Sequence, residues 1–460
     1  MPTSSYFKVF ITLLLLLHAM PAVAQRHHKG DDTPTKPKKV YVDDESCGCE
    51  LVFVDGIQTT QRNGLYGFKR EDGTEIVPPT YMFVDEFHGN YCLVLRDYEH
   101  QFGMINRSGK EILPCIYDEI AYPTEGIIKV RRGKYFGYFD TTGREVLTPQ
   151  WPSASSFFEG RAAVGVYVDT AVDEALTFGF IDTTGQFVLP PVYEYAYPFQ
   201  EGKATVKQYD RLGVIDRDGK EVIPIKYAEV TTPYQGRVFV RDAESGLIAL
   251  FDLEGHRLTD FCYNDVLSYG DGLYSVCRDT MQYFLNEKGK ERFGGWQRAG
   301  KFIDGYAAVQ RDGKWGIINA KGRTILPCRY DNKALMPGSY TFYEGMALVE
   351  QDGRFGFCNT KGDIVIPVIY DNAFFFSEGL APVSVKGAWG YINRKGEEVI
   401  PFMFGPSSYF EYGRASVIYN SHEYKINPSG QCVKDCSTFP TQEVQRRMAA
   451  LAVKRHKSKK

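Results

Sequence analysis

The 460-residue sequence predicts an all-β protein, a tandem array of about eleven three-stranded antiparallel meanders. Three observations favour this class. Tyr, Phe and Gly are plentiful (31, 31 and 45 residues), which suits many short strands joined by tight turns. A turn motif that ends in glycine recurs eleven times between strand-like apolar runs. Because 43% of the residues are hydrophobic, the chain also has ample material for a buried core.

The N-terminus predicts export. Lys8 is followed by an apolar run, and small residues at Ala22 and Ala24 fit a signal peptide that is cut after Ala24. The run is shorter than the roughly 20 residues that a helix needs to cross a bilayer, and no later stretch reaches that length. We therefore expect a signal peptide at 1–24, a polar linker at 25–49, and a periplasmic or extracellular protein whose mature chain has no transmembrane helix.

The repeat period sets the domain organisation. Ten intervals separate the eleven turn glycines; eight measure 33–36 residues, and the other two measure 42 and 40. The longer intervals predict surface loop insertions at 167–176 and 333–342. One unit cannot bury a sufficient core by itself, so neighbouring copies must stack. We expect the array at 50–432 and a basic C-terminal tail at 433–460, whose last residues, 453–460, form a solvated, frayed end. The turn glycines are Gly73, Gly109, Gly143, Gly185, Gly219, Gly255, Gly289, Gly322, Gly362, Gly396 and Gly430.

Each unit begins with a strand and a glycine turn, as in "KWGIINAKGRTILPCRYD" at 314–331. Asn319 precedes Gly322 by three residues, and Asx-x-x-Gly recurs in ten of the eleven copies. An Asx side chain accepts hydrogen bonds from the following backbone N–H groups, and glycine takes the positive φ of a tight hairpin. Gly316 lies inside the strand, where a missing side chain lets a ring or another backbone approach closely. The spacing of the two glycines does not fit a phosphate-binding loop.

The second and third strands follow the turn. Proline lies five residues after the turn glycine in seven copies, Pro327 among them, and predicts the end of the second strand because it lacks an N–H group. An aromatic residue follows three positions later; core packing is favoured for it over a ligand-stacking ladder. A third glycine, often after an acidic residue as in "FEGRAAV", leads into the next strand. The aromatic residues are Tyr81, Tyr117, Trp151, Tyr193, Tyr227, Tyr263, Tyr330, Tyr370 and Phe404.

The combined motif resembles the bacterial WG-repeat family, also called KWG repeats. "KWGIINAKGRTILPCRYD", "AWGYINRKGEEVIP" and "FFFSEGLAPVSVKG" are close matches to its unit, and the resemblance extends over about 380 residues. Only Trp315 and Trp389 keep the literal WG pair. The resemblance implies a β-rich repeat structure in exported or envelope proteins, with no established common activity.

The pattern leaves the closure of the array open. Eleven copies exceed the four to eight blades that are usual for a β-propeller, which favours an open or superhelical array. The truncated copy that begins at His422 could either cap such an array or complete the first blade of a closed β-propeller.

The composition and motifs favour a binding protein over an enzyme. A formal charge of −3 gives no reason to expect nucleic acid as a partner. The motifs of common hydrolases are missing, and the histidines of the array stand singly. "IDRDGKEV" around Asp216 lacks the ligands of an EF-hand. We expect a non-catalytic scaffold without cofactor or metal that binds a protein or glycan. The alternative is an envelope-associated enzyme, such as a glycan hydrolase that uses loop carboxylates.

Two sets of residues are candidates for sites. The copies at 247–297 depart most from the repeat, and "GGWQRAGKF" suggests an exposed Trp296, so the candidate ligand surface is Trp296, Trp315 and Trp389. Four cysteines flank the array and predict disulfides, including a staple between its two ends, with metal ligation by the first pair as the weaker alternative. These cysteines are Cys47, Cys49, Cys432 and Cys436.

Overall fold

The computed structural model describes residues 39–44, 49–97, 101–168, 175–331, 341–434 and 436–457. The predicted signal peptide, most of the linker, Cys47 and most of the two loop insertions lie outside these ranges. Within them the chain forms strands, a short 3₁₀ turn η1 (Cys436–Thr438) and one α-helix, α2 (Thr441–Lys457). The all-β prediction for the array is confirmed.

The strands form eleven small antiparallel sheets, and each sheet uses strands that are consecutive in the sequence. The first six sheets are β1 (Lys39–Asp44), β2 (Cys49–Val54), β3 (Ile57–Arg62), β4 (Leu65–Arg70) and β5 (Glu75–Tyr81); β6 (Phe83–Val84), β7 (Tyr91–Leu95), β8 (Phe102–Asn106) and β9 (Glu111–Tyr117); β10 (Glu119–Ile120), β11 (Ile127–Arg132), β12 (Tyr135–Asp140) and β13 (Glu145–Trp151); β14 (Ser153–Ala154), β15 (Ala162–Tyr167), β16 (Leu176–Ile181) and β17 (Phe187–Tyr193); β18 (Tyr195–Ala196), β19 (Lys203–Gln208), β20 (Arg211–Asp216) and β21 (Glu221–Tyr227); β22 (Glu229–Val230), β23 (Arg237–Arg241) and β24 (Ile248–Asp252).

The remaining five sheets follow the same plan. They are β25 (Asp265–Gly270), β26 (Leu273–Arg278), β27 (Met281–Asn286) and β28 (Glu291–Trp296); β29 (Arg298–Ala299), β30 (Tyr306–Arg311), β31 (Lys314–Asn319) and β32 (Thr324–Tyr330); β33 (Met346–Gln351), β34 (Arg354–Asn359) and β35 (Ile364–Tyr370); β36 (Asn372–Ala373), β37 (Leu380–Val385), β38 (Ala388–Asn393) and β39 (Glu398–Phe404); β40 (Ala415–Tyr419), β41 (His422–Ile426) and β42 (Cys432–Lys434).

Most sheets contain one strand more than the three predicted. In most of these sheets the additional strand is two residues long and starts two residues after the aromatic that ends the preceding sheet: β9 ends at Tyr117, and β10 begins at Glu119. β10 pairs with β11, so the chain passes from the last strand of one sheet directly to the first strand of the next. Two residues are too few to show the alternation that identifies a strand in a sequence.

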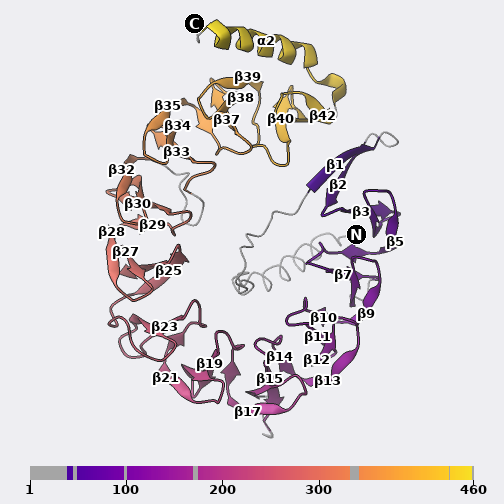
Figure 1. The fold of residues 1–460 in the computed structure, drawn as a ribbon, viewed down its shortest axis with the longest axis vertical. Helices are drawn as coiled ribbons and strands as arrows, with labels where there is room; N and C mark the ends of the chain where they lie inside the picture. Colours follow the sequence, from indigo (N-terminus) through magenta and orange to yellow (C-terminus); the bar gives the residue numbers. More distant parts are fainter. Residues whose placement is uncertain are drawn as a thin grey trace, which may run out of the picture.

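The sheets follow one another along a path that curves around a common centre (Figure 1). The short first strands lie toward the centre and the long last strands lie outside, as the labels β10 and β13 show. In the described part of the chain, no strand of the last sheet pairs with the first sheet, β1–β5. The strand pairing therefore leaves the array open, as predicted.

The core lies between consecutive sheets rather than within any one of them. Phe180 and Tyr193 of the sheet β14–β17 pack with Phe199 and Val206, which belong to the next repeat. The other clusters join neighbouring sheets in the same way, for example Met104 with Val130. Each repeat thus buries its apolar face only against its neighbours, as the stacking argument predicts.

The repeated aromatic residues are part of this core. All nine are buried, with exposed fractions from 1% at Tyr330 to 8% at Tyr193. The prediction of core packing is confirmed, and the alternative of a ligand-stacking ladder is wrong.

The strand glycine and the proline face each other. Trp315 pairs with Tyr330 and Ile317 with Leu326, so Pro327 lies in a bulge of β32 that passes opposite Gly316. A Cβ atom at Gly316 would lie 2.5 Å from the backbone oxygen of Leu326. The predicted close approach of another backbone is confirmed. The prediction that proline ends the strand is wrong, because the bulge removes the ladder hydrogen bond that proline could not make.

The Asx-Gly turns are confirmed. The Asn319 Oδ1 atom accepts hydrogen bonds from the backbone N–H groups of Lys321 and Arg323, both at 3.0 Å, and Gly322 has a φ of +77°. The same pair of bonds recurs at Asp140, where Thr142 and Arg144 are the donors.

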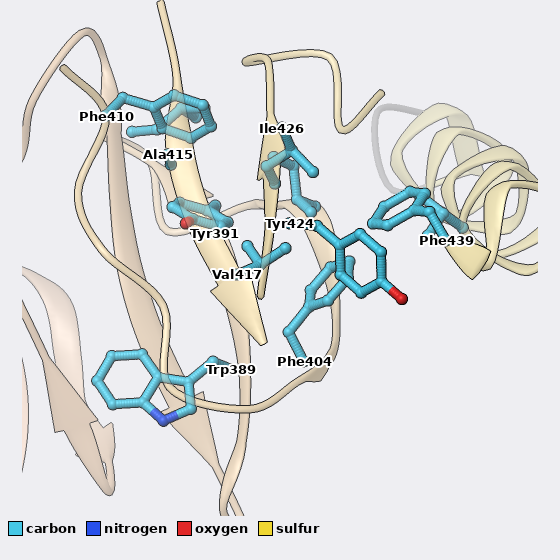
Figure 2. Packing of buried hydrophobic residues seen from close by; sticks show 12 residues of the cluster. Trp389, Tyr391, Phe404, Phe410, Ala415, Val417, Tyr424, Ile426 and Phe439 are labelled. Carbon is cyan, nitrogen blue, oxygen red and sulfur yellow. The ribbon is translucent and has the colours of Figure 1, made fainter. Parts of the chain in front are cut away.

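The predicted C-terminal tail contains η1 and α2, and part of it packs against the array, a feature that the sequence pattern does not indicate. Phe439 and Val444 pack into the core of the last two sheets, beside Phe404 and Tyr424, and α2 covers that end of the array (Figure 2). The helix caps the truncated last copy and gives its apolar face a partner. In the described ranges, neither α2 nor η1 has the length and apolarity of a membrane-spanning helix.

Candidate binding surface

In most repeats the residue before the third glycine is acidic, and it has an unusual backbone. In these acid–glycine turns both residues have positive φ; the angles are +53° at Glu159 and +71° at Gly160. Such a pair forms the tight turn that leads into the second strand of a sheet. Glutamate rarely adopts this region, so a specific contact is needed to favour it. The acid–glycine turns are Asp55–Gly56, Glu125–Gly126, Glu159–Gly160, Glu201–Gly202, Asp271–Gly272, Asp304–Gly305, Glu344–Gly345 and Glu378–Gly379.

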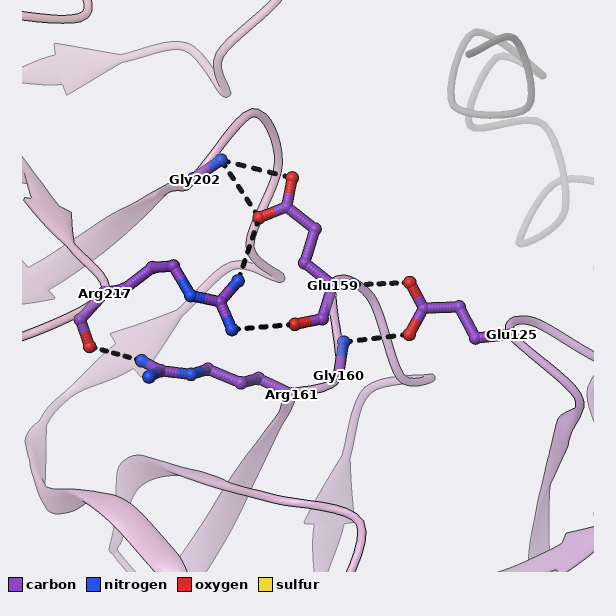
Figure 3. Close-up of polar contacts among 6 residues, drawn as sticks. All are labelled: Glu125, Glu159, Gly160, Arg161, Gly202 and Arg217. Atoms are coloured by element: carbon purple, nitrogen blue, oxygen red, sulfur yellow. Dashed lines mark hydrogen bonds and ion pairs between the residues drawn. The ribbon is translucent and has the colours of Figure 1, made fainter. Parts of the chain in front are cut away.

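The contact is a carboxylate that bonds to the turn of the next repeat. The Glu125 carboxylate accepts hydrogen bonds from the backbone N–H groups of Glu159 (2.6 Å) and Gly160 (2.9 Å), and Glu159 accepts one from Gly202 at 2.9 Å (Figure 3). We call this contact the carboxylate clamp. It recurs between Glu201 and Gly236, Asp271 and Gly305, Glu344 and Gly379, and Glu378 and Gly413.

Arginines of the Asx-Gly turns support the clamp. Arg217 donates to the backbone oxygen of Glu159 at 3.0 Å and lies 3.4 Å from its carboxylate (Figure 3). Arg394 occupies the equivalent position at Glu344, with its guanidinium 2.7 Å from the Glu344 carboxylate. Burial raises the pKa of Glu344, but the bonds from Arg394 and from the Gly379 N–H outweigh it and leave that pKa below its ordinary value. These contacts place both kinds of turn on one face of the array, which we call the clamp face.

A second set of acids joins the repeats at the opposite ends of the strands. Asp118 follows Tyr117, and its carboxylate accepts a hydrogen bond from the Gly133 N–H (2.6 Å). The Asp331 carboxylate likewise accepts one from the Asp352 N–H (2.9 Å). The sequence pattern alone assigned no role to either set of acids. The signal was present in the recurring "EG" and "YD" pairs.

Removing one clamp tests its contribution to stability. Glu159→Ala keeps the strain of a Cβ atom at positive φ and loses the hydrogen bonds, so we expect it to destabilise the local sheet by about 1–2 kcal/mol. Glu159→Gly loses the same hydrogen bonds but relieves that strain, so it should cost about 1 kcal/mol less. The rates of native-state amide hydrogen exchange in β15 and β19 measure the loss of stability in both variants. If the two variants opened as rarely as the wild type, the clamp would have no energetic role.

The three candidate tryptophans do not form an exposed surface. Trp296, Trp315 and Trp389 are 9%, 7% and 9% exposed and lie in three different core clusters. Trp296 pairs with Gln282 at the end of β28, in the buried aromatic position of the repeat, and the Arg311 guanidinium lies 4.3 Å from its ring centroid. The expectation of an exposed Trp296 is wrong because its polar neighbours belong to the adjoining turns, while the ring points into the core.

The cysteines pair differently from the predicted staple. Cys432 and Cys436 form a disulfide with each other, which joins β42 to η1, so neither is available to the N-terminal pair. Cys47 lies outside the described residues, and Cys49 is described only by its backbone in β2.

One group of possible metal ligands occurs among the described residues. Asp252, Glu254 and His256 bring their ligand atoms within 4.8 Å of one another. They form an Asx turn in which Asp252 Oδ1 accepts hydrogen bonds from the N–H groups of the other two, and His256 Nδ1 lies 3.0 Å from Asp252 Oδ2. Turn formation accounts for this arrangement.

Partly exposed aromatic rings gather on the clamp face. Tyr343, Phe375 and Tyr409 precede the third glycine in three successive repeats, and we call them the aromatic row. The rings of Tyr343 and Phe375 stack at 4.1 Å, and those of Phe375 and Tyr409 lie 4.5 Å apart. Tyr409 is 37% exposed. Neither the sequence period nor the WG pair indicated this row, because its members occupy different positions in their repeats.

The comparison with solved structures found similar chains at low TM-scores. One similar solved structure is a eukaryotic initiation factor, with 11% sequence identity, coverage of 72% of this chain and 92% of that chain, and a TM-score of 0.31. Another is Hsv2 of Kluyvelomyces marxianus, with 11% identity, coverage of 67% of this chain and 95% of that chain, and a TM-score of 0.27. PorZ, a bacterial surface component of the type-IX secretion system of Porphyromonas gingivalis, is also similar (10%, 78% and 52%, 0.24). At these TM-scores the similarities support no further conclusion. No curated protein matches the sequence.

A family model identifies the repeat itself. The model of the WG containing repeat matches nine segments, which together cover well over half of the chain. They are residues 66–98, 102–135, 136–166, 178–211, 213–242, 284–315, 315–355, 355–387 and 389–421. The chain therefore belongs to the WG-containing repeat family.

Proposed function

We propose that the protein is an exported, non-catalytic scaffold that binds a protein or glycan partner on its clamp face, at the aromatic row. The observation that carries this proposal is the stack of Tyr343, Phe375 and Tyr409, three rings from successive repeats on one side of the array. Stacked repeats provide extended surfaces, and aromatic residues are enriched at the centres of binding interfaces.

The surroundings of the aromatic row support a rigid binding surface. The ring of Phe375 contacts the other two rings, stacked on Tyr343 and tilted against Tyr409. The carboxylate clamps at Glu344 and Glu378 connect the turns that follow these rings. A partner would therefore lose little free energy in ordering the surface.

The same contacts argue against the enzyme alternative. A glycan hydrolase needs a pair of carboxyl groups that face the substrate. Carboxylates on the clamp face are already engaged within the protein. Those of Glu125 and Glu159 accept hydrogen bonds from backbone N–H groups, and that of Glu344 pairs with Arg394. We therefore propose that these carboxylates connect the repeats and take no part in catalysis.

Substitution of Tyr409 tests the proposal. The full chain would be screened against fractionated envelope proteins and bacterial surface glycans, and we expect Tyr409→Ala to weaken retention of the partner about tenfold or more. Tyr209→Ala is the matched control, because Tyr209 is 83% exposed in a hairpin between β19 and β20, away from the row. If the two variants lost retention of the partner equally, the aromatic row would be excluded as the binding site. If the wild type retained no partner, the scaffold function itself would be excluded.

A further inference from the structure

The repeat pattern is broken where the sheet β22–β24 meets the sheet β25–β28. Gln235 replaces the acid of the regular turn. The Tyr269 hydroxyl lies within hydrogen-bond distance of the Gln235 side-chain oxygen, and 3.0 Å from the Glu287 carboxylate. A tyrosine, an amide and a carboxylate thus meet at the place where a carboxylate clamp would otherwise join two turns.

The backbone of the sheet β25–β28 explains how Tyr269 reaches this place. Its first strand, β25, is six residues long instead of two and pairs with β26 up to Gly270 and Leu273. Tyr269 therefore lies opposite Tyr274 as a cross-strand pair, with ring centroids 4.6 Å apart. In regular repeats the corresponding residue is a fully buried phenylalanine, such as Phe199. Here the ring is half-buried and carries a hydroxyl.

Tyr274 supplies an independent sign of a missing ligand. Its side chain is 3% exposed, and its hydroxyl has no hydrogen-bond partner among the described residues. Such a group costs about 1–3 kcal/mol, and native proteins rarely leave one without a reason. Burial raises the pKa of Tyr274, and the nearby Tyr269, Glu287 and Tyr234 raise it further while Arg237 lowers it. The hydroxyl therefore lies within electrostatic reach of the whole cluster.

The remaining members complete a compact polar and aromatic patch. The Tyr234 ring stands edge-on to Tyr269, with centroids 5.4 Å apart. Arg237 donates to the backbone oxygens of Glu287 and of Gly236, the latter at 2.6 Å, so its guanidinium is engaged within the protein. Arg237 balances Glu287, and the neighbouring Glu201 carboxylate is engaged by the backbone N–H groups of Gln235 and Gly236, which favours a neutral ligand over an anionic one.

We propose that Tyr234, Gln235, Tyr269, Tyr274 and Glu287 form a subsite for a neutral, hydroxyl-rich glycan. This inference rests on the proposed binding function and narrows its partner to a glycan. The tyrosine rings provide apolar surface for the C–H face of a sugar, and the amide, carboxylate and hydroxyl groups bond to sugar hydroxyls. A sugar hydroxyl would supply the partner that the Tyr274 hydroxyl lacks. Aromatic walls with a few placed polar groups are typical of small-ligand sites.

Tyr274→Phe is the decisive variant, because removing a hydroxyl that makes no hydrogen bond should leave the fold intact. Removing an unpartnered hydroxyl should raise the melting temperature while weakening the binding of neutral oligosaccharides about tenfold. Titration calorimetry of the full chain with cellohexaose, maltohexaose and chitohexaose measures the affinity. Tyr391→Phe is the matched control: its buried hydroxyl donates to the Ser408 backbone oxygen at 2.8 Å, so its loss should lower the melting temperature and leave binding unchanged.

Gln235→Glu provides a second test, because it restores the acid of the regular turn and places a second carboxylate beside Glu287. We expect it to weaken binding about tenfold as well. Unchanged affinity in both variants, or binding of charged oligosaccharides alone, would overturn the subsite. A partner that is lost with Tyr409→Ala but kept with Tyr274→Phe would overturn the subsite and leave the scaffold proposal standing. A wild type that binds neither glycan nor protein would overturn both.

Discussion

Replacing Gly316 with alanine is expected to destabilise the sheet β29–β32 by about 3 kcal/mol or more. The new Cβ would lie 2.5 Å from the Leu326 oxygen and 2.8 Å from the Cys328 nitrogen, both backbone atoms of the bulge that contains Pro327. Backbone cannot move aside as a flexible side chain can, so β31 and β32 would have to separate. Native-state hydrogen exchange of the amides of the two strands would report the loss.

Gly313→Ala is the matched control in the same sheet. Gly313 has a φ of +73°, and no atom of the described residues lies within 4 Å of the position that a Cβ atom would take there. Alanine at this position therefore meets only the backbone penalty of about 1 kcal/mol. The difference between the two variants isolates the close approach at Gly316. Equal losses would mean that glycine is needed in this repeat only for turn conformation.

The turn chemistry and the period could be predicted because they are local. Asn319 makes its hydrogen bonds to Lys321 and Arg323, and Gly322 closes the same turn, so five consecutive residues contain the whole cause. Stacking followed from the size of the unit, and the buried ring of Tyr330 followed from its fixed register. These features repeat in sequence as they repeat in space.

The course of the second strand could not be predicted from proline alone. Pro327 prevents a ladder hydrogen bond, and a strand can respond by ending or by bulging. The bulge is favoured here because Gly316 leaves room for it and because Tyr330, three residues later, pairs again with Trp315. The choice depends on two strands at once, whereas the sequence pattern describes each strand separately.

The candidate surface was missed for the same reason. The clamp from Glu125 to Gly160 spans 35 residues, and its meaning depends on how one sheet sits against the next. The three tryptophans were candidates because tryptophan is rare in this chain and because the repeat is degenerate around Trp296. A large apolar ring, however, contributes more stability when it is buried in an inter-sheet core than when it lies on an exposed turn. The cluster around Tyr269 lies within the region where the repeat is most degenerate, so the sequence indicated the region but not the residues.

The C-terminal helix should be as important for the last repeats as the strand glycine is for its own sheet. Val444 is 2% exposed and belongs to the final core. Phe404 and Phe439 of the same core are shown in Figure 2. We expect Val444→Asp to destabilise the last two sheets by about 3 kcal/mol or more, since it buries a carboxylate without a partner. The amides of β38 and β41 should then exchange faster, while those of β15 and β16 keep their wild-type rates, because each repeat contacts only its neighbours.

Gln442→Asp separates the effect of burial from that of charge. Gln442 is exposed in the first turn of α2, where a negative charge is favourable, so this variant should be neutral or slightly stabilising. If Val444→Asp left the exchange of β38 and β41 unchanged, α2 would be an appendage and the last sheet would be stable without it. If it accelerated exchange along the whole array, the repeats would open as one cooperative unit, and the carboxylate clamps that link successive turns would be the contacts to examine for that coupling.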